Sequence, residues 1–368
     1  MAHSGRIAAL DALSGKPAQK PPWLLLTWGF DYMWKCAGIP PWRLALGGFD
    51  TWVNAYCATY ERHKPDIIIF DGFGAGSEDG VLVEDTREKW IALFEGERFE
   101  FIKSSYTLRH RPRGPVEPPP PLETIEDIDR RFQPGGHDPG RLKGLSAVVR
   151  DLGDRALVIP TCIPGYIAAC YTLGFERAMT TLIDNERFFF HLADRFEECD
   201  DLRMRQFAEA GAEAVLIADA WASVDVLSPE MIRKFALPYQ ARSVNAAKAA
   251  GLKAILWNEG DVGPILADQA ALDIDAFAFE QPRKGFGVTV AQVREAFGPH
   301  RCLLGNLDSE HLLMRNNPDE IREAVIEQIS QSREGAPFIL SFGSPIPSNT
   351  PESAVDAVAN AVREFRWT

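Results

Sequence analysis

Short apolar runs recur along this chain and alternate with longer stretches in which apolar residues return every three or four positions. Eight of the short runs are rich in aliphatic residues, and most are apolar throughout instead of alternating between apolar and polar positions. Unbroken apolar runs are typical of parallel strands that are covered on both faces. The predicted strands are residues 23–28, 66–71, 156–161, 214–219, 254–259, 274–280, 301–306 and 337–342.

The stretches between these runs carry helix signals. One of them, residues 228–251, starts with Ser-Pro-Glu and ends in glycine. This predicts Ser228 as the N-cap, Pro229 as the first helical residue and Gly251 as the C-cap. Strands that alternate with helices in this way predict an α/β fold of the (β/α)8 TIM-barrel class. A doubly wound open sheet is the second choice, because neither G-x-G-x-x-G nor a phosphate-binding loop follows an early strand.

Residues 76–150 depart from this alternation of predicted strands and helices. The stretch VLVEDTREKWIALFEGERFEFIKSSYTL predicts antiparallel strands, and VEPPPPLETIEDIDRRFQPGGHDPGR predicts a Pro-rich loop with a short helix. We interpret 76–150 as one insertion, a β-hairpin plus a Pro-rich loop, between the second and third strands of the barrel. Residues 1–368 are then expected to form a single, distorted barrel domain.

Composition narrows the class of partner. The net charge of −13 has the wrong sign for a surface that binds nucleic-acid phosphates. The six cysteines form no C-x-x-C pair, which indicates reduced thiols in a cytoplasmic protein. The N-terminal stretch lacks the apolar core of a signal peptide, and no run reaches the roughly 18 apolar residues of a membrane span. We expect a cytoplasmic protein that binds neither nucleic acid nor membranes.

In a barrel of this class the active site lies at the carboxyl ends of the strands. The predicted strand ends carry many acids and aromatic residues and no histidine, which disfavours a zinc site of His and Cys and a histidine-activated nucleophile. The candidate catalytic residues are Asp71, Asp219, Glu259 and Glu280. The candidate substrate-binding residues are Trp28, Asp31, Trp34, Tyr166, Trp221, Trp257, Asn258, Arg283, Asn306 and Ser344.

Four carboxylates at one mouth allow several kinds of chemistry. Like charges in a confined space raise one another's pKa, so one of the four could act as a general acid or base. Asp219, Glu259 and Glu280 could instead hold a hard metal ion, or the mouth could receive a cationic substrate against its tryptophans. Each acid taken alone could also be an ordinary turn former or helix cap.

Three C-terminal motifs carry a resemblance to a known family. They are LSPEMIRKFALPY after the strand that ends in Asp219, HRCLLGNLDSEHLL, and SFGSPIPSNTPESAV. In combination they closely resemble the uroporphyrinogen decarboxylase superfamily, strongly over residues 205–365 and more weakly before. The resemblance implies a distorted (β/α)8 barrel, often a homodimer, with a funnel at the carboxyl ends of the strands.

The superfamily has two branches, and this sequence departs from both. The decarboxylase branch holds the many carboxylates of uroporphyrinogen with arginines in its first loop, where this chain has Asp31, Trp34 and Lys35. Asp71 is the best match for that branch's aspartate after strand two, and Ser344 stands where that branch has a histidine. We therefore reject uroporphyrinogen as the substrate.

The methyltransferase branch binds zinc through His-x-Cys-Gly after strand five and a cysteine in the strand-eight loop. This chain has Trp257, Asn258, Glu259 and Gly260 in the first place and Ser344 in the second. Activation of a thiolate by zinc, which needs imidazole and sulfur ligands, is not expected with these residues. We read this stretch as a re-purposed site, with an indole wall and a carboxylate.

Three functions follow, in order of preference. The first is an enzyme that transfers a methyl or other C1 group from a small molecule without the His/Cys zinc site, with Glu259 or Asp71 as proton donor. Its methyl acceptor would be a corrinoid protein or tetrahydrofolate. The second is a metal-independent decarboxylase or other lyase of a small organic acid, anchored by Arg283 or Lys35. The third is a non-catalytic binding protein. For each of these functions, the family resemblance also implies that the protein forms a homodimer.

Overall fold

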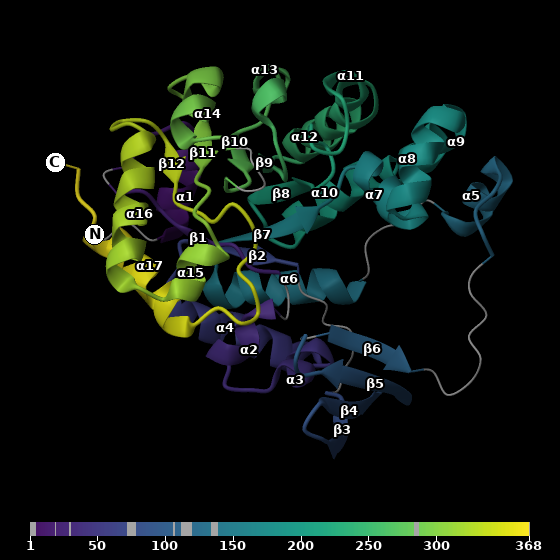
Figure 1. The fold of residues 1–368 in the computed structure, drawn as a ribbon, viewed down its shortest axis with the longest axis horizontal. Coiled ribbons are helices and arrows are strands. Elements are labelled where there is room, and N and C mark those ends of the chain that lie inside the picture. The colour runs from purple at the N-terminus through teal and green to yellow at the C-terminus, as the bar shows by residue number, and fades with distance from the viewer. Residues whose placement is uncertain are drawn as a thin grey trace.

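Eight parallel strands form the centre of the computed structural model, which describes residues 5–18, 20–28, 31–71, 79–105, 107–111, 120–133, 139–282 and 287–367. The strands follow one another around the sheet in the order in which they occur in the chain. They are β1 Leu24–Leu25, β2 Ile67–Phe70, β7 Leu157–Cys162, β8 Ala214–Asp219, β9 Lys253–Asn258, β10 Ala276–Phe279, β11 Cys302–Leu304 and β12 Phe338–Ile339. Each of the eight predicted runs overlaps one of these strands to within one residue at the ends of β7 and β9, and Figure 1 shows the strands at the centre of the molecule.

The sheet closes on itself between its first and last strands. A parallel bridge joins Trp23 to Leu340, and Leu24 N donates to Leu340 O at 2.9 Å while Leu340 N donates to Pro22 O at 2.9 Å. The predicted (β/α)8 barrel is therefore confirmed. Closure removes exposed edges, which explains why such short strands suffice.

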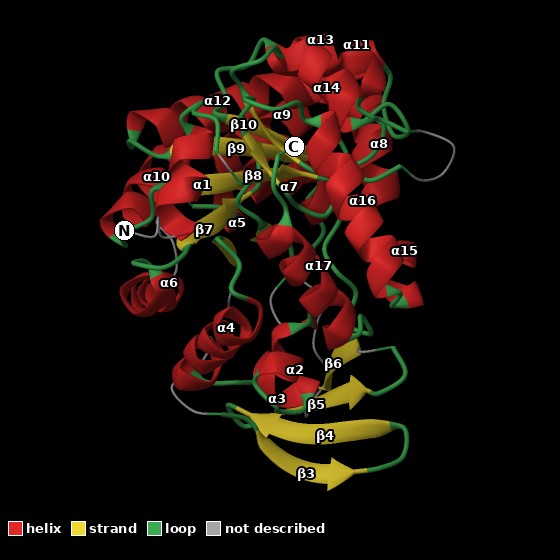
Figure 2. Ribbon diagram, turned by 90° about the vertical axis from the view of Figure 1, so that its left-hand side faces the viewer, coloured by secondary structure: helices red, strands yellow, loops and turns green. Residues whose placement is uncertain are grey.

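Helices surround the barrel (Figure 2). Those before β8 are α1 Gly5–Leu13, α2 Met33–Cys36, α3 Pro41–Ala45, α4 Phe49–His63, α5 Ile125–Arg131, α6 Pro139–Leu152, α7 Gly165–Leu173, α8 Phe175–Asp184, α9 Glu186–Glu197 and α10 Asp200–Glu209. Those after it are α11 Pro229–Met231, α12 Leu237–Ala249, α13 Leu266–Ala270, α14 Val290–Phe297, α15 His311–Arg315, α16 Pro318–Gln331 and α17 Glu352–Glu364. None of the helices described here is long and apolar enough to cross a bilayer.

The helical segment after β8 begins and ends as predicted. The Ser228 side chain accepts a hydrogen bond from Met231 N, and Gly251 adopts a left-handed φ of 79°. Between α11 and α12 the chain forms a π-helical turn, Ile232–Ala236. Pro238 has no N–H with which to continue the α-helical pattern, which gives a reason for the widened turn. The helix resumes with Gln240 and Ser243 buried on its inner face.

The insertion between β2 and β7 contains more strands than predicted. Instead of one hairpin, four antiparallel strands pair in sequence order: β3 Val81–Asp85, β4 Lys89–Phe94, β5 Glu97–Ile102 and β6 Thr107–Arg111. Figure 2 shows this sheet below the barrel, next to α2 and α3. It has a small core of its own, in which Phe101 and Ala92 are buried with Trp42 and Leu46. The first half of the PPPP run, residues 118–119, lies outside the described residues.

The last part of the predicted insertion is a barrel helix. Residues 139–150 belong to α6, whose Leu145, Val148 and Leu152 are buried in the main core. A Cβ at Gly144 would lie 3.0 Å from the Phe70 ring of β2, so α6 packs closely on the barrel. The sequence pattern missed this helix because its Gly and Pro residues resemble those of the preceding loop.

Candidate functional site

The side chains at the ends of β8, β9 and β10 divide into two layers. The register aligns Ala218, Trp257 and Ala278 in one row and Asp219, Asn258 and Phe279 in the next. Because successive side chains of a strand point to opposite faces, one row faces the barrel axis and the other faces the helices. Trp257 identifies the inner row: its ring lies against Trp28, with centroids 5.7 Å apart, and its Nε1 donates to Gly343 O at 3.2 Å.

Asp219 and Asn258 therefore face the helices. Gln240 Nε2 of α12 lies 2.9 Å from Asp219 Oδ2 and 3.0 Å from Asn258 Oδ1. Gln269 Nε2 of α13 donates to the same Asn258 Oδ1 at 2.8 Å, and Asn258 Nδ2 donates to Ala222 O at 2.9 Å. This placement differs from the predicted one, in which both residues lined the mouth. The two residues fasten β8 and β9 to the helical layer.

Burial, and not a cluster of like charges, changes the pKa of Asp219. Its carboxyl is fully buried, and this burial raises its pKa to about 7, against smaller opposite effects of Gln240 and the Trp221 backbone. The predicted mechanism, mutual repulsion of four acids, does not account for this shift. Asp219 is consequently neutral in a large fraction of molecules near pH 7.

Glu280 joins three loops at the mouth. Its side chain is 2% exposed, and it accepts hydrogen bonds from Gly260 N at 2.7 Å and from Ser344 Oγ at 3.1 Å. Gly260 needs its glycine, because its φ is +86° and a Cβ would lie 2.2 Å from Ser223 Oγ. Asn306 Nδ2 donates to Glu280 O at 3.0 Å. The structure thus brings together three predicted site residues, Glu280, Ser344 and Asn306.

Glu259 stands next to an aromatic group that the sequence did not single out. Alternation after Asn258 directs Glu259 toward the mouth, and it is partly exposed. Tyr171 of α7 is 52% exposed and its ring meets Trp221 edge-on, with centroids 5.1 Å apart. Burial, then Glu259 and Asp219, raise the pKa of Tyr171 to about 12. The available signal was an aromatic residue on the helix directly after a barrel strand.

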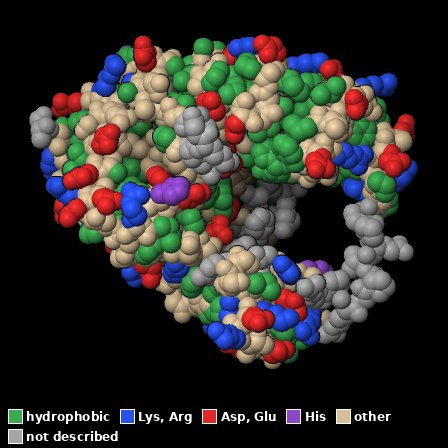
Figure 3. All heavy atoms as spheres, viewed as in Figure 1, with side chains coloured by type: hydrophobic (Ala, Val, Ile, Leu, Met, Phe, Trp, Pro, Cys, Tyr) green, Lys and Arg blue, Asp and Glu red, His purple; other side chains and the backbone are tan. Residues whose placement is uncertain are grey.

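Hydrophobic side chains gather on the surface around Tyr171. Phe175 of α8 is 50% exposed and also packs edge-on against Trp221, with ring centroids 5.2 Å apart. In Figure 3 hydrophobic side chains cover the region where Figure 1 places α7 and α8. Tyr166, predicted to bind substrate, lies beneath them: it is fully buried, and its OH donates to Trp221 O at 3.2 Å. Tyr166 supports Trp221 and offers no surface to a ligand.

The loop after β1 is tied to the loop after β12. Ser348 Oγ lies 3.4 Å from Asp31 Oδ1, and burial raises the pKa of Asp31. Trp34 Nε1 donates to the backbone O of Asp31 at 3.1 Å. Lys35 Nζ donates to Thr350 O at 2.6 Å. The lysine offered as an anchor for a substrate carboxylate is therefore engaged by the protein itself.

Asp71 and Arg283 are the remaining predicted site residues. Asp71 follows β2 and is half-buried, and Tyr56 OH of α4 lies 3.4 Å from its Oδ1. Arg283 lies outside the described residues. Within the described residues no three His, Cys, Asp or Glu side chains are grouped so that they could hold a metal ion. The outward direction of Asp219 explains why it forms no such group with Glu259 and Glu280.

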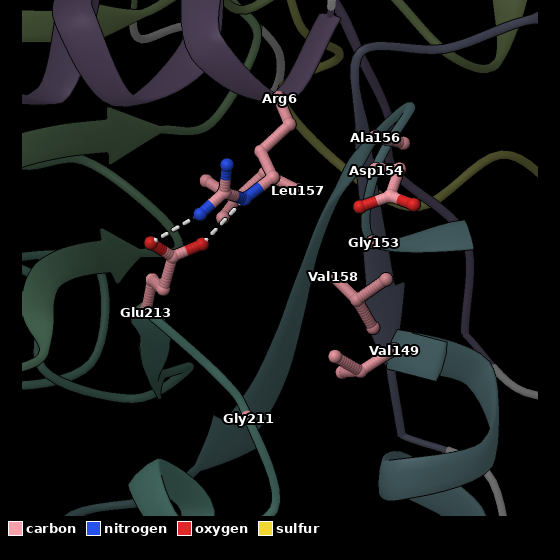
Figure 4. Close-up of a pocket in the computed structure, with 9 residues that line it drawn as sticks. All are labelled: Arg6, Val149, Gly153, Asp154, Ala156, Leu157, Val158, Gly211 and Glu213. Carbon is pink, nitrogen blue, oxygen red and sulfur yellow. Dashed lines mark hydrogen bonds and ion pairs between the residues drawn. The ribbon is translucent and has the colours of Figure 1, made fainter. Parts of the chain in front are cut away.

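An open pocket lies at the opposite end of the barrel (Figure 4). It has a volume of about 270 Å³ and is lined by residues that precede β7 and β8, among them Asp154, Gly211 and Glu213. Arg6 of α1 spans it and makes two hydrogen bonds to Glu213, at 2.6 and 2.7 Å. Since barrel enzymes act at the carboxyl ends of their strands, this pocket is no part of the candidate site.

Buried acids with raised pKa values predict how stability depends on pH. Burial raises the pKa of Asp66 to about 6 and that of Asp219 to about 7. The native state then binds more protons than the unfolded chain between about pH 4 and pH 7, so the free energy of unfolding falls as the pH rises. Asp219→Asn should flatten this fall by about 1–3 kcal/mol in urea denaturation at pH 5 and pH 8. An unchanged slope would contradict the assignment.

The barrel and the polar ends of its strands define this chain as a TIM-barrel protein with an enzyme-like mouth. The family model for uroporphyrinogen decarboxylase (URO-D) matches residues 107–365. The chain belongs to the uroporphyrinogen decarboxylase family, as its motifs predicted. Its relatives in this family are enzymes, although their named activities differ.

Two relatives and one solved structure illustrate that difference. Uroporphyrinogen decarboxylase of Chlorobaculum tepidum is 25% identical over 262 residues, 67% of this chain and 71% of the relative. Methylcobamide:CoM methyltransferase MtbA of Methanosarcina mazei is 24% identical over 250 residues, 67% of this chain and 70% of the relative. A methyltransferase structure from Methanosarcina mazei superimposes with a TM-score of 0.74 at 20% identity, covering 98% of this chain and 99% of that one. The last likeness supports the fold.

Proposed function

We propose that this protein transfers a methyl or other C1 group from a small molecule, without a zinc site of His and Cys. The observation that carries the proposal is the inner face of the β9 end. Trp257 pairs there with Trp28 to form an aromatic wall, and Glu259 lies within electrostatic range of the exposed Tyr171. A methyltransferase among the relatives supports the reaction class.

The residues at the mouth do not fit a zinc ion. Three positions correspond to zinc ligands in the methyltransferase branch: Trp257 and Glu259 stand at the His and Cys of His-x-Cys-Gly, and Ser344 stands at the cysteine of the strand-eight loop. Ser344 Oγ donates to Glu280, and of the three only Glu259 carries an ionisable oxygen. Trp257 has no atom suited to bind the ion, because its only nitrogen is an N–H donor. The proposed reaction therefore uses the carboxyl group of Glu259, as a proton donor, where the methyltransferase branch uses a metal.

The proposed step balances without an added oxidant or reductant. The methyl group passes to a nucleophilic acceptor, a reduced corrinoid or tetrahydrofolate, and its bond to the leaving heteroatom breaks. The leaving group keeps the electron pair of that bond and takes the proton of the protonated Glu259 carboxyl. Solvent returns this proton to Glu259 when the acceptor is a corrinoid, and the N–H proton released on methylation balances it when the acceptor is tetrahydrofolate. General acid catalysis of this kind lowers the barrier most when the leaving group is a poor one. The corrinoid would be carried by a separate protein.

A metal-independent lyase of a small organic acid is the second candidate. The uroporphyrinogen decarboxylases among the relatives favour it, as does the position of Asp71 after β2 with Tyr56 OH 3.4 Å away. Uroporphyrinogen itself remains a poor substrate, because the first loop has no arginine and Lys35 is held by Thr350 O. Asp71 would stabilise a developing positive charge or donate the proton that replaces CO2.

A single screen distinguishes the two. Purified protein is incubated with a panel of O-, N- and S-methylated small molecules and with the corresponding carboxylic acids, in the presence of cob(I)alamin or tetrahydrofolate. Formation of methylcobalamin or methyltetrahydrofolate supports methyl transfer. Release of CO2 without methylation of either acceptor refutes it in favour of the lyase. Glu259→Gln serves as the matched control for activity from contaminating enzymes.

A further inference from the structure

A pair of buried carboxyls lies behind the candidate site. Glu197 at the end of α9 is 6% exposed and Asp200 at the start of α10 is 3% exposed. Ser243 Oγ of α12 lies 3.0 Å from Glu197 Oε1 and 2.8 Å from Asp200 Oδ2. Arg203 forms an ion pair with Asp200. The mechanism proposed above does not use this cluster.

Counting protons in the cluster shows which acid is neutral. The Ser243 hydroxyl has one proton, so it can donate to only one of the two carboxyls that it touches. Burial raises the pKa of Asp200 and Arg203 opposes this effect. The ion pair with Arg203 makes Asp200 the ionised member of the pair, so a protonated Glu197 donates to Asp200 or to Ser243. Burial, followed by repulsion from Asp200, raises the pKa of Glu197 to about 8, in agreement with this arrangement.

The second oxygen of Glu197 holds the first turn of α7. Gly165 N donates to Glu197 Oε2 at 2.7 Å. A Cβ at Gly165 would lie 2.4 Å from Ala193 O of α9, so only glycine allows this close approach. In the same helix, Tyr166 directly follows Gly165 and lies beneath Trp221, and Tyr171, six residues after Gly165, lies against the Trp221 ring. Any shift of the first turn of α7 would move both tyrosines.

We infer that Glu197 is a positioning residue of the candidate site: through Gly165 it sets α7, and thereby places the Tyr171 phenol beside Trp221. The inference rests on the proposed function for the importance of Tyr171, and its test needs no methyl donor. Titratable and charged side chains on each neighbouring element lie around Glu197, and their charges affect the pH at which Glu197 ionises. They are Asp194 of α9, Asp200 and Arg203 of α10, Tyr239 and Arg242 of α12, and Cys162 of β7.

Glu197→Gln and Glu197→Ala test the inference together. The amide of glutamine can accept from Gly165 N and donate to Ser243, whereas alanine can do neither. Hydrogen exchange of residues 165–173 should be roughly tenfold or more faster in Glu197→Ala than in the wild type at pH 6.5, since a buried N–H loses its partner. Glu197→Gln should restore protection.

The site itself supplies the second readout. Nitration of Tyr171 by tetranitromethane, followed by peptide mass spectrometry, should be faster in Glu197→Ala and in Gly165→Ala, whose new Cβ would press on Ala193 O. Val325→Ala, in the buried face of α16, controls for destabilisation alone. If neither variant alters nitration beyond that control, Glu197 does not position Tyr171. Should Glu197→Ala fail to fold, Gly165→Ala decides by the same comparison.

Discussion

Replacing Glu259 by glutamine should lower kcat/KM for methyl transfer by about 100- to 10,000-fold, the range that a positioned general acid contributes. The free energy of unfolding should change little, because Glu259 is only partly buried and lies after the last residue of β9. Glutamine keeps the shape of the side chain and removes its acidic proton. Steady-state kinetics with the donor found by the screen, and urea denaturation, measure the two effects.

Asp219→Asn is the matched control for that experiment. Asp219 pairs in register with Asn258, the residue directly before Glu259. The side chain of Asp219 nevertheless contacts Gln240, on the side that faces the helices. The substitution should leave kcat/KM close to that of the wild type. Equal losses in both variants would show that the two-layer assignment of the strand ends is wrong, and full activity of Glu259→Gln would remove Glu259 from the mechanism.

Trp257→Ala should give the largest loss of stability among the mouth residues, about 3–5 kcal/mol, as expected for removal of a buried aromatic side chain. Trp257 is 4% exposed, packs on Trp28 and donates to Gly343 O. Binding of the methyl donor should be lost together with the wall that Trp257 forms. Chemical denaturation and equilibrium titration measure the two losses.

Trp257→Phe separates the ring from its N–H group. It keeps most of the aromatic surface and should cost about 0.5–1.5 kcal/mol for the hydrogen bond to Gly343 O. A Trp257→Ala variant no less stable than Trp257→Phe would contradict the placement of the indole in the barrel interior. In that case the paired tryptophans could not form a wall of the site.

The fold could be predicted because its strands are covered on both faces. Each buried strand leaves an unbroken apolar run, and runs such as 66–71 and 214–219 stand out between amphipathic helices. The cap residues Ser228 and Gly251 mark a helix by local chemistry alone. Pairing within the insertion depends on contacts between segments distant in sequence, so its four-stranded sheet was underestimated as one hairpin.

The same feature made the candidate site harder to predict. A strand that is apolar on both faces carries no alternation, so the sequence could place Asp219 at a strand end but could not say which way it points. Its partner, Gln240, is fixed by the packing of α12 and has no signal of its own. Glu197 and Asp200 lie in FEECDD, which resembles a solvated helix end, and only tertiary packing buries them.

The most direct test of the account is the rate at which a preparation freed of metal by chelation methylates cob(I)alamin, with its metal content measured in parallel. The mouth presents an indole and a carboxylate, Trp257 and Glu259, in place of imidazole and thiolate ligands. The account predicts that the rate is the same before and after chelation and is lost in Glu259→Gln. A rate that disappears on chelation and returns with stoichiometric zinc would contradict it.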